Sequence, residues 1–200
     1  MGADVLRKEK PMQLLIKQRV FSWTDTYDVY DEKEEPKYFV KAEFFALGHQ
    51  IHVYDKSGRE VGMVKQRLLT LLPAFDIEIG GKEFGSVQKE FSFFKPRYEL
   101  DYNGWRCEGD FLAWDYDVYE ECCAVVHISK KPFHWGDTYV IEILDPKDEI
   151  MALMLAIAID AANCTNKQSS SQTEDHVENQ KDRSGNMEEM VWRILEKKRM

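Results

Sequence analysis

The stretch that decides the fold is an uninterrupted apolar run, Ile150-Met151-Ala152-Leu153-Met154-Leu155-Ala156-Ile157-Ala158-Ile159. A helix made from it has no polar face, so it must be buried on every side. At about 1.5 Å per residue the run reaches about half of the ~30 Å hydrocarbon core of a bilayer. The sequence therefore predicts a helix over residues 148–162 that fills the inside of a domain, with Asp148 as its N-cap.

Before this run, short apolar segments alternate with turn sequences, which is typical of antiparallel strands. The clearest turns are Asp55-Lys56-Ser57-Gly58, Gly80-Gly81 and Asn103-Gly104. Gly-Gly and Asn-Gly are strong hairpin signals, because both central residues of a type I′ turn need a positive φ. We therefore expect a mainly β protein made of consecutive hairpins.

Two repeats indicate that this sheet curls into a barrel. Gly62, Gly85 and Gly109 recur once per hairpin, and a glycine inside a strand usually marks a bulge or a tight bend. On a longer scale, Tyr27-Asp28-Val29-Tyr30 recurs as Tyr116-Asp117-Val118-Tyr119. The second half of the domain is thus predicted to be a divergent copy of the first.

The composition divides the chain of 200 residues into one domain and a tail. We expect a barrel domain over residues 12–164. A polar segment over 165–186 buries too little apolar surface to fold, so we expect a disordered linker there. Apolar residues at helical spacing then predict a short amphipathic helix over 187–200.

The formal net charge of −9 disfavours nucleic acid as a partner, because phosphate binding requires a basic surface. The first residues form no apolar segment of signal-peptide length, and no apolar run is long enough to span a membrane. We expect a cytoplasmic protein without a transmembrane span, in which peripheral contact with a membrane stays open.

The four cysteines, Cys107, Cys122, Cys123 and Cys164, form no C-x-x-C pair, so a zinc framework is not expected. Free cysteine is most often simply buried, which predicts buried, reduced thiols. The neighbours Cys122 and Cys123 are expected on opposite faces of a strand.

No motif points to catalysis, a metal or a cofactor. His49 and His52 are three residues apart on a predicted strand and so face opposite sides. Asp115 and Asp117 alternate with apolar residues, which indicates a solvated strand face rather than a calcium site. The chain has no G-x-S-x-G, Walker or dinucleotide-binding motif. We therefore expect no catalytic residue, no metal and no cofactor.

The candidate binding residues are five cations. Lys65 and Arg67 share one face of a predicted strand, and Lys89, Lys95 and Arg97 lie around Phe91, Phe93 and Phe94 in the sequence. Basic side chains beside aromatic ones suit an anionic lipid headgroup. The alternative is an ordinary solvated rim, which the acidic character of the whole chain favours.

The order of these features, hairpins with an internal repeat, then Asp145-Pro146-Lys147-Asp148, then one apolar helix, resembles the LURP-one-related (LOR, YxjI-type) family. The fold of that family is similar to Tubby C-terminal domains and phospholipid scramblases. The resemblance covers residues 12–164 and implies a closed barrel of about twelve strands around a central hydrophobic helix. It also implies a lipid- or partner-binding module. The chain lacks the cysteine-rich segment and the membrane anchor that scrambling would require.

The function that these observations favour is a non-enzymatic binding or scaffold protein, associated with anionic membrane lipid or with a protein partner. The alternative is a small-molecule enzyme or ligand-binding protein that uses a pocket at the barrel rim. A convergent group of titratable residues in such a pocket would favour the enzyme.

Overall fold

The computed structural model describes residues 10–17, 26–45, 48–93, 95–133 and 136–164. The predicted linker over 165–186 and the predicted amphipathic helix over 187–200 lie outside the described residues.

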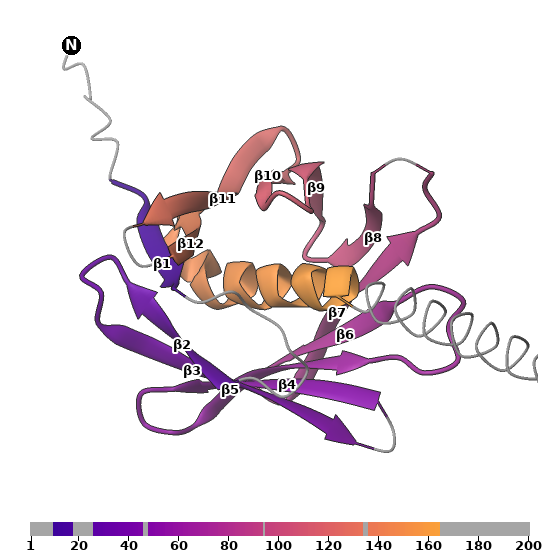
Figure 1. Ribbon diagram of the computed structural model, residues 1–200, viewed down its shortest axis with the longest axis horizontal. Helices are drawn as coiled ribbons and strands as arrows, with labels where there is room; N and C mark the ends of the chain where they lie inside the picture. Colours follow the sequence, from indigo (N-terminus) through magenta and orange to yellow (C-terminus); the bar gives the residue numbers. More distant parts are fainter. Residues whose placement is uncertain (1–9, 18–25, 46–47, 94, 134–135, 165–200) are drawn as a thin grey trace, which may run out of the picture. The chain divides into compact units, whose positions relative to one another are not determined.

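The described chain forms one sheet of twelve strands (Figure 1). The strands are β1 (Met12–Ile16), β2 (Thr26–Asp31), β3 (Pro36–Phe45), β4 (Gly48–Asp55), β5 (Glu60–Gln66), β6 (Ala74–Ile79), β7 (Lys82–Glu90), β8 (Arg97–Tyr102), β9 (Trp105–Asp110), β10 (Asp115–Glu120), β11 (Cys123–Phe133) and β12 (Gly136–Ile143). Their order is β8-β7-β6-β5-β4-β3-β2-β1-β12-β11-β10-β9, and all paired neighbours are antiparallel. The predicted mainly β barrel is confirmed.

The barrel is nearly closed rather than closed, because the end strands β8 and β9 do not pair with each other in the described part of the chain. Asn103 and Gly104 make the expected turn with φ of 52° and 67°, but each flanking strand hydrogen-bonds to its other neighbour. At the far end of this seam, Asn163 bridges the two sides. Its amide oxygen accepts a hydrogen bond from the Tyr98 hydroxyl, and its amide nitrogen donates to the Phe111 carbonyl at 3.1 Å.

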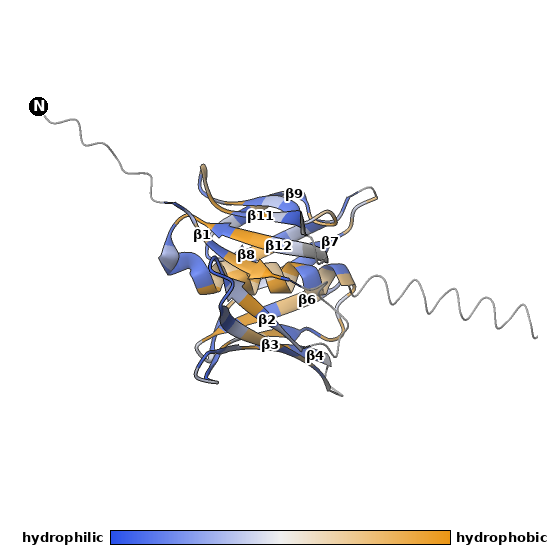
Figure 2. Ribbon diagram, turned by 60° about the vertical axis from the view of Figure 1, so that its left-hand side comes forward, coloured by the Kyte–Doolittle hydropathy of each residue, from blue (hydrophilic) through white to orange (hydrophobic). Residues whose placement is uncertain are grey.

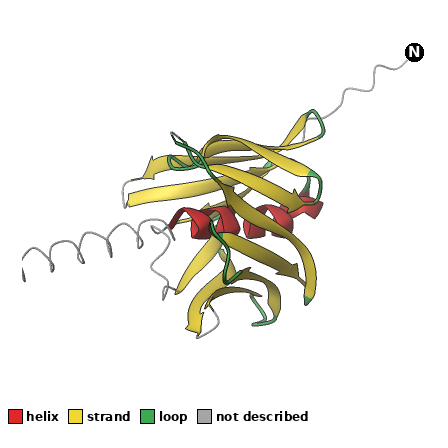
Figure 3. Ribbon diagram, turned by 90° about the vertical axis from the view of Figure 1, so that its right-hand side faces the viewer, coloured by secondary structure: helices red, strands yellow, loops and turns green. Residues whose placement is uncertain are grey.

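The apolar run is a helix that begins at residue 149, one residue later than predicted, and continues through residue 164, the last described residue. A 3₁₀ turn, Pro146–Asp148, leads into it, and Asp145 caps this turn by accepting a hydrogen bond from the Lys147 amide at 3.0 Å. Residues 152–163 are all buried. Figure 2 shows apolar colour along the helix, and Figure 3 shows it running between strands of the sheet.

The glycine pattern reflects close packing in the wall. A Cβ atom at Gly62 would lie 2.6 Å from the Met154 Sδ atom of the helix. A Cβ atom at Gly85 would lie 2.1 Å from the Asp101 carbonyl oxygen of the neighbouring strand. Glycine is needed at these two positions because a side chain would push the helix or the next strand away.

The long sequence repeat has a structural counterpart. The pairing register shifts after Val29 in β2 and after Val118 in β10, which are equivalent positions of the two copies. Tyr27 and Tyr116, also equivalent, are both buried, and burial together with the charge of Asp160 raises the pKa of both hydroxyls.

The cysteine prediction is wrong for Cys122 and Cys123, which are exposed. Strand alternation does not separate them, because Cys122 belongs to the turn before β11 and only Cys123 to the strand. Their Sγ atoms lie 4.0 Å apart. Cys107 is partly buried, and burial raises its pKa to about 12.

Candidate functional site

All five candidate cations lie at one end of the barrel. Residues 67–73 connect β5 to β6, and residues 91–96 connect β7 to β8. Because β5, β6, β7 and β8 are consecutive antiparallel neighbours, both connections emerge at the same end, on the right-hand side of Figure 1. We call this the loop end. The opposite end, which carries the tight turns at residues 32–35, 56–59 and 80–81, is the turn end.

Two of the five cations are engaged in ion pairs. The Arg67 guanidinium lies 2.5 Å from an oxygen of Asp76, and the Lys95 ammonium lies 3.1 Å from an oxygen of Asp110. The bond from Lys95 is the main reason that the pKa of Asp110 is lowered. The Arg67 and Lys95 side chains therefore neutralise carboxylates on the surface of the protein itself.

The other three cations, Lys65, Lys89 and Arg97, have no carboxylate within ion-pair distance among the described residues. Lys65 and Arg97 are exposed, and partial burial lowers the pKa of Lys89. The structure thus brings the predicted residues to one end of the barrel and leaves three of them available to an external anion.

The loops themselves expose large apolar side chains. Leu69 is fully exposed and Leu71 is 99% exposed on the first loop, and Phe91 and Phe93 are 74% and 85% exposed on the second. The two phenylalanine rings pack edge to face with centroids 5.0 Å apart. Single exposed apolar residues are common, but a group of them on neighbouring loops makes this end of the barrel a candidate interaction site.

The backbone of the loop that carries the exposed leucines is held by hydrogen bonds at its base. The Arg67 amide donates to the Ala74 carbonyl at 2.8 Å, which closes the loop, and the Lys89 amide donates to the Pro73 carbonyl at 2.9 Å, which ties it to β7. Leu69 holds a φ of 61°, a conformation that is strained for a leucine. Sequence reasoning missed this loop, although Leu68-Leu69-Thr70-Leu71-Leu72 before a proline was a visible signal.

A second feature lies on the outer face of the barrel, toward the turn end. A hollow of about 560 Å³ is lined by Lys37, Phe39, Lys41, Tyr54 and Lys56, among others. These side chains come from β3, from β4 and from the turn after β4, so no sequence motif announces them.

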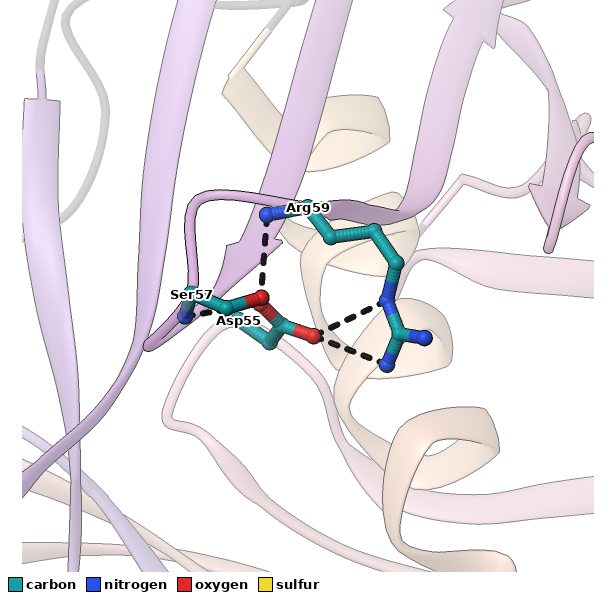
Figure 4. A network of polar contacts seen from close by, with 3 residues as sticks. All are labelled: Asp55, Ser57 and Arg59. Carbon is teal, nitrogen blue, oxygen red and sulfur yellow. Dashed lines mark hydrogen bonds and ion pairs between the residues drawn. The ribbon is translucent and has the colours of Figure 1, made fainter.

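The turn beside this hollow is held by Asp55 (Figure 4). One oxygen of Asp55 accepts hydrogen bonds from the Ser57 amide at 2.9 Å and the Arg59 amide at 3.1 Å, and the other accepts from the Arg59 guanidinium at 2.9 and 3.1 Å. The hydrogen bond from the Ser57 hydroxyl is the largest of the causes that lower the pKa of Asp55 to about 2.

The remaining candidates form no metal centre within the described ranges, where no group of three or more His, Cys, Asp or Glu side chains is arranged to hold an ion. His52 pairs with Glu60 at 2.9 Å, and His127 pairs with Asp117 at 2.8 Å. Asp115 and Asp117 face outward while Tyr116 and Val118 are buried, as the alternation predicted. In the same part of the chain, no helix combines the length and apolar character needed to cross a bilayer.

The fold and the matches to known proteins define the family. The family model described as LURP-one-related matches residues 12–160, which is most of the barrel, and the chain belongs to this family. It is 32% identical over 149 residues to the uncharacterized protein YxjI of Bacillus subtilis (strain 168), covering 74% of this chain and 92% of that protein. It also resembles an X-ray structure of a protein from Arabidopsis thaliana, with a TM-score of 0.53 and 18% identity, covering 76% of this chain and 91% of the other. At that identity the second likeness shows the fold alone.

Proposed function

We propose that this chain is a non-enzymatic binding protein that attaches to the surface of anionic lipid bilayers through its loop end. The observation that carries the proposal is the pair of neighbouring loops that place Leu69, Leu71, Phe91 and Phe93 in water. Lys65, Lys89 and Arg97 lie at the bases of these loops, without carboxylate partners among the described residues.

The expected energies favour insertion of the apolar side chains over simple charge attraction. Fully burying one leucine or phenylalanine contributes about 1.5–3 kcal/mol, whereas one cation near an anionic surface contributes about 1 kcal/mol. Glu90 lies opposite Arg97 in the strand pairing and offsets part of the local positive charge. The net charge of −9 opposes approach of the whole chain to the membrane. Binding should therefore require anionic lipid for approach, and apolar insertion for most of its strength.

A bilayer suits these loops better than a folded partner does. The side chains protrude from two separate connections and are almost wholly exposed, and a fluid surface closes around such projections without needing a matching shape. Cations at the base of the loops would then lie at the level of the headgroups when the tips reach the acyl chains.

Sedimentation with vesicles tests the proposal directly. The full chain is mixed with phosphatidylcholine vesicles of rising phosphatidylserine content, at low and high salt. We expect binding that rises with phosphatidylserine and falls with salt. The double variants Leu69→Ser/Leu71→Ser and Phe91→Ser/Phe93→Ser should each weaken binding about tenfold or more.

The matched control is Leu144→Ser, since Leu144 is 58% exposed and directly follows β12 at the turn end. For charge, Lys65→Glu and Lys89→Glu are compared with Lys82→Glu, an exposed lysine at the start of β7. Equal binding by the loop variants and the Leu144 control would overturn the proposal. Sedimentation velocity without lipid identifies the competing outcome, in which the loops hold a second copy of the chain.

The alternative of a small-molecule enzyme finds little support in the outer hollow. In the outer hollow, the Lys37 ammonium lies 2.5 Å from a carboxylate oxygen of Glu149, and that of Lys41 lies 2.5 Å from one of Glu43. Burial and the charge of Glu149 raise the pKa of the Tyr38 hydroxyl. Lys37 and Lys41 are thus engaged in ion pairs, and the raised pKa of Tyr38 keeps its hydroxyl protonated near neutral pH, which favours binding over acid–base catalysis.

A further inference from the structure

The outer hollow has an apolar floor made by two aromatic rings. Phe39 in β3 and Tyr54 in β4 are directly opposite each other, with ring centroids 6.4 Å apart and planes at 42°. The His52 ring stacks on the far side of this pair, 6.2 Å from Tyr54. Phe39 is 41% exposed on the outside of the barrel, where it contributes little to the core. The Phe39 and Tyr54 rings together form a surface on which the flat ring of a ligand can pack.

Positive charge borders the floor. Lys37 and Lys41 line the hollow from β3, and their ammonium groups are held in ion pairs with Glu149 and Glu43. Lys56 contributes from the turn after β4. Its ammonium lies 4.0 Å from the nearest oxygen of Glu35, and both side chains are exposed, so this pair contributes little.

The two aspartates at the hollow act differently from each other. Asp55 is occupied by Ser57 and Arg59, so it does not compete for Lys56. Asp28 lies opposite Phe39 on β2, at the other edge of the floor, and forms no ion pair among the described residues. The hollow thus has a cation at one edge and a hydrogen-bond acceptor at the other.

We propose that this hollow binds a small, flat aromatic anion. Its rings would pack on Phe39 and Tyr54, its acidic group would meet Lys56, and an N–H or O–H on its opposite edge would donate to Asp28. The volume of about 560 Å³ falls within the range of small-molecule sites, roughly 300–1,000 Å³. The site lies away from the loop end and is independent of membrane attachment.

Fluorescence titration of the full chain with anilinonaphthalene sulfonate tests this inference, because the dye carries fused aromatic rings, an N–H and a sulfonate. Phenylnaphthylamine has the same rings and N–H without the sulfonate, so it isolates the contribution of charge. We expect saturable binding at one site, with higher affinity for the sulfonate. Phe39→Ala should lower the affinity for both dyes about tenfold, which corresponds to about 1.4 kcal/mol. Lys56→Ala should lower the affinity for the sulfonate alone.

Two controls keep the test decisive. Lys82→Ala removes an exposed lysine outside the hollow and should leave both affinities unchanged. Phe91→Ser/Phe93→Ser removes the other exposed rings, to which an apolar dye also responds. Dye binding that survives Phe39→Ala but disappears with the loop variant would overturn the site. Equal affinity for the two dyes, unaffected by Lys56→Ala, would overturn the preference for an anion. Lys56 lies on an exposed turn, so Lys56→Ala is not expected to alter the fold. It therefore still tests the site if Phe39→Ala does.

Discussion

The two ends of the barrel are built from the same strands but differ in what their connections expose. At the turn end, carboxylates fold back onto the backbone: one oxygen of Asp31 accepts hydrogen bonds from the Lys33 and Glu35 amides, both at 2.9 Å. At the loop end, Leu71 and Phe93 are exposed to water, and the connection that carries Leu71 is nevertheless held by backbone hydrogen bonds of 2.8 and 2.9 Å.

This difference separates residues kept for folding from residues available for contact. A turn whose aspartate satisfies its own amide groups needs no partner. An exposed leucine gains nothing from the folded state that it would not have in the unfolded chain, so stability does not explain its presence. The loop end is therefore where a partner surface should be sought, and the turn end is where stability should respond to substitution.

The largest expected difference in stability is between the same substitution, leucine to aspartate, made in the core and made at the loop end. Leu153 in the helix is 0% exposed, whereas Leu69 is fully exposed. Leu153→Asp buries an unpaired charge at several kcal/mol, against a total stability of about 5–15 kcal/mol, and should prevent folding. Leu69→Asp should change stability by less than about 0.5 kcal/mol. Thermal melting of both variants checks this, and a Leu153→Asp protein that melts cooperatively near the wild-type temperature would contradict a buried helix.

A smaller difference in the free energy of unfolding is expected between a glycine inside a strand and a glycine in a turn. Gly58 has a φ of 79° and open space around it, whereas Gly62 faces the helix. Gly62→Asn should destabilise the fold by about 1–3 kcal/mol, because an overpacked core shifts its neighbours. Gly58→Asn should have a much smaller effect, since asparagine tolerates a positive φ. Denaturant unfolding measures both, and equal losses would show that backbone conformation rather than space decides at Gly62.

The smallest effect is the pH dependence that comes from the Asp55 turn. The pKa of Asp55 is lowered from 3.8 to about 2 in the folded protein, so its charged form contributes stability above pH 3.8 that is lost as the pH falls through 2. Asp55→Asn should lower the melting temperature at neutral pH, and the difference from wild type should shrink as the pH falls from 4 toward 2.

The control for this pH series is Asp115→Asn, which removes an exposed carboxylate that has no hydrogen bond among the described residues. A difference for Asp55→Asn that stays constant across that pH range would show that the turn depends on side-chain geometry rather than on charge.

The sequence was most informative where one local pattern has one physical solution. Alternating strands with Gly80-Gly81 can hardly form anything except a hairpin, and β6 and β7 pair around it as predicted. Asn103-Gly104 was equally clear, and its turn forms, but the two strands beside it do not pair. Whether two strands pair depends on how each is already hydrogen-bonded to its neighbour on the other side, and no local sequence pattern shows that.

The candidate site was predicted in part. Arg97 was selected because it lies near aromatic residues in the sequence, and Lys65 because it shares a strand face with Arg67. The structure places both at the same end of the sheet. The leucine loop was missed, since apolar residues are expected inside a domain and their exposure shows only in three dimensions. The outer hollow was missed for a related reason, because Phe39 and Tyr54 become neighbours only through the pairing of β3 with β4.

Local sequence patterns are enough to predict the mainly β character, the buried helix and the family, because turn chemistry and hydrophobic pattern act over a few residues at a time. Where the barrel stays open, which apolar side chains face water and which rings meet across strands became visible only in the fold. Those outcomes depend on contacts between residues far apart in the chain, such as Asn163 with Phe111, whose energies are set by the packing of the whole sheet around the helix.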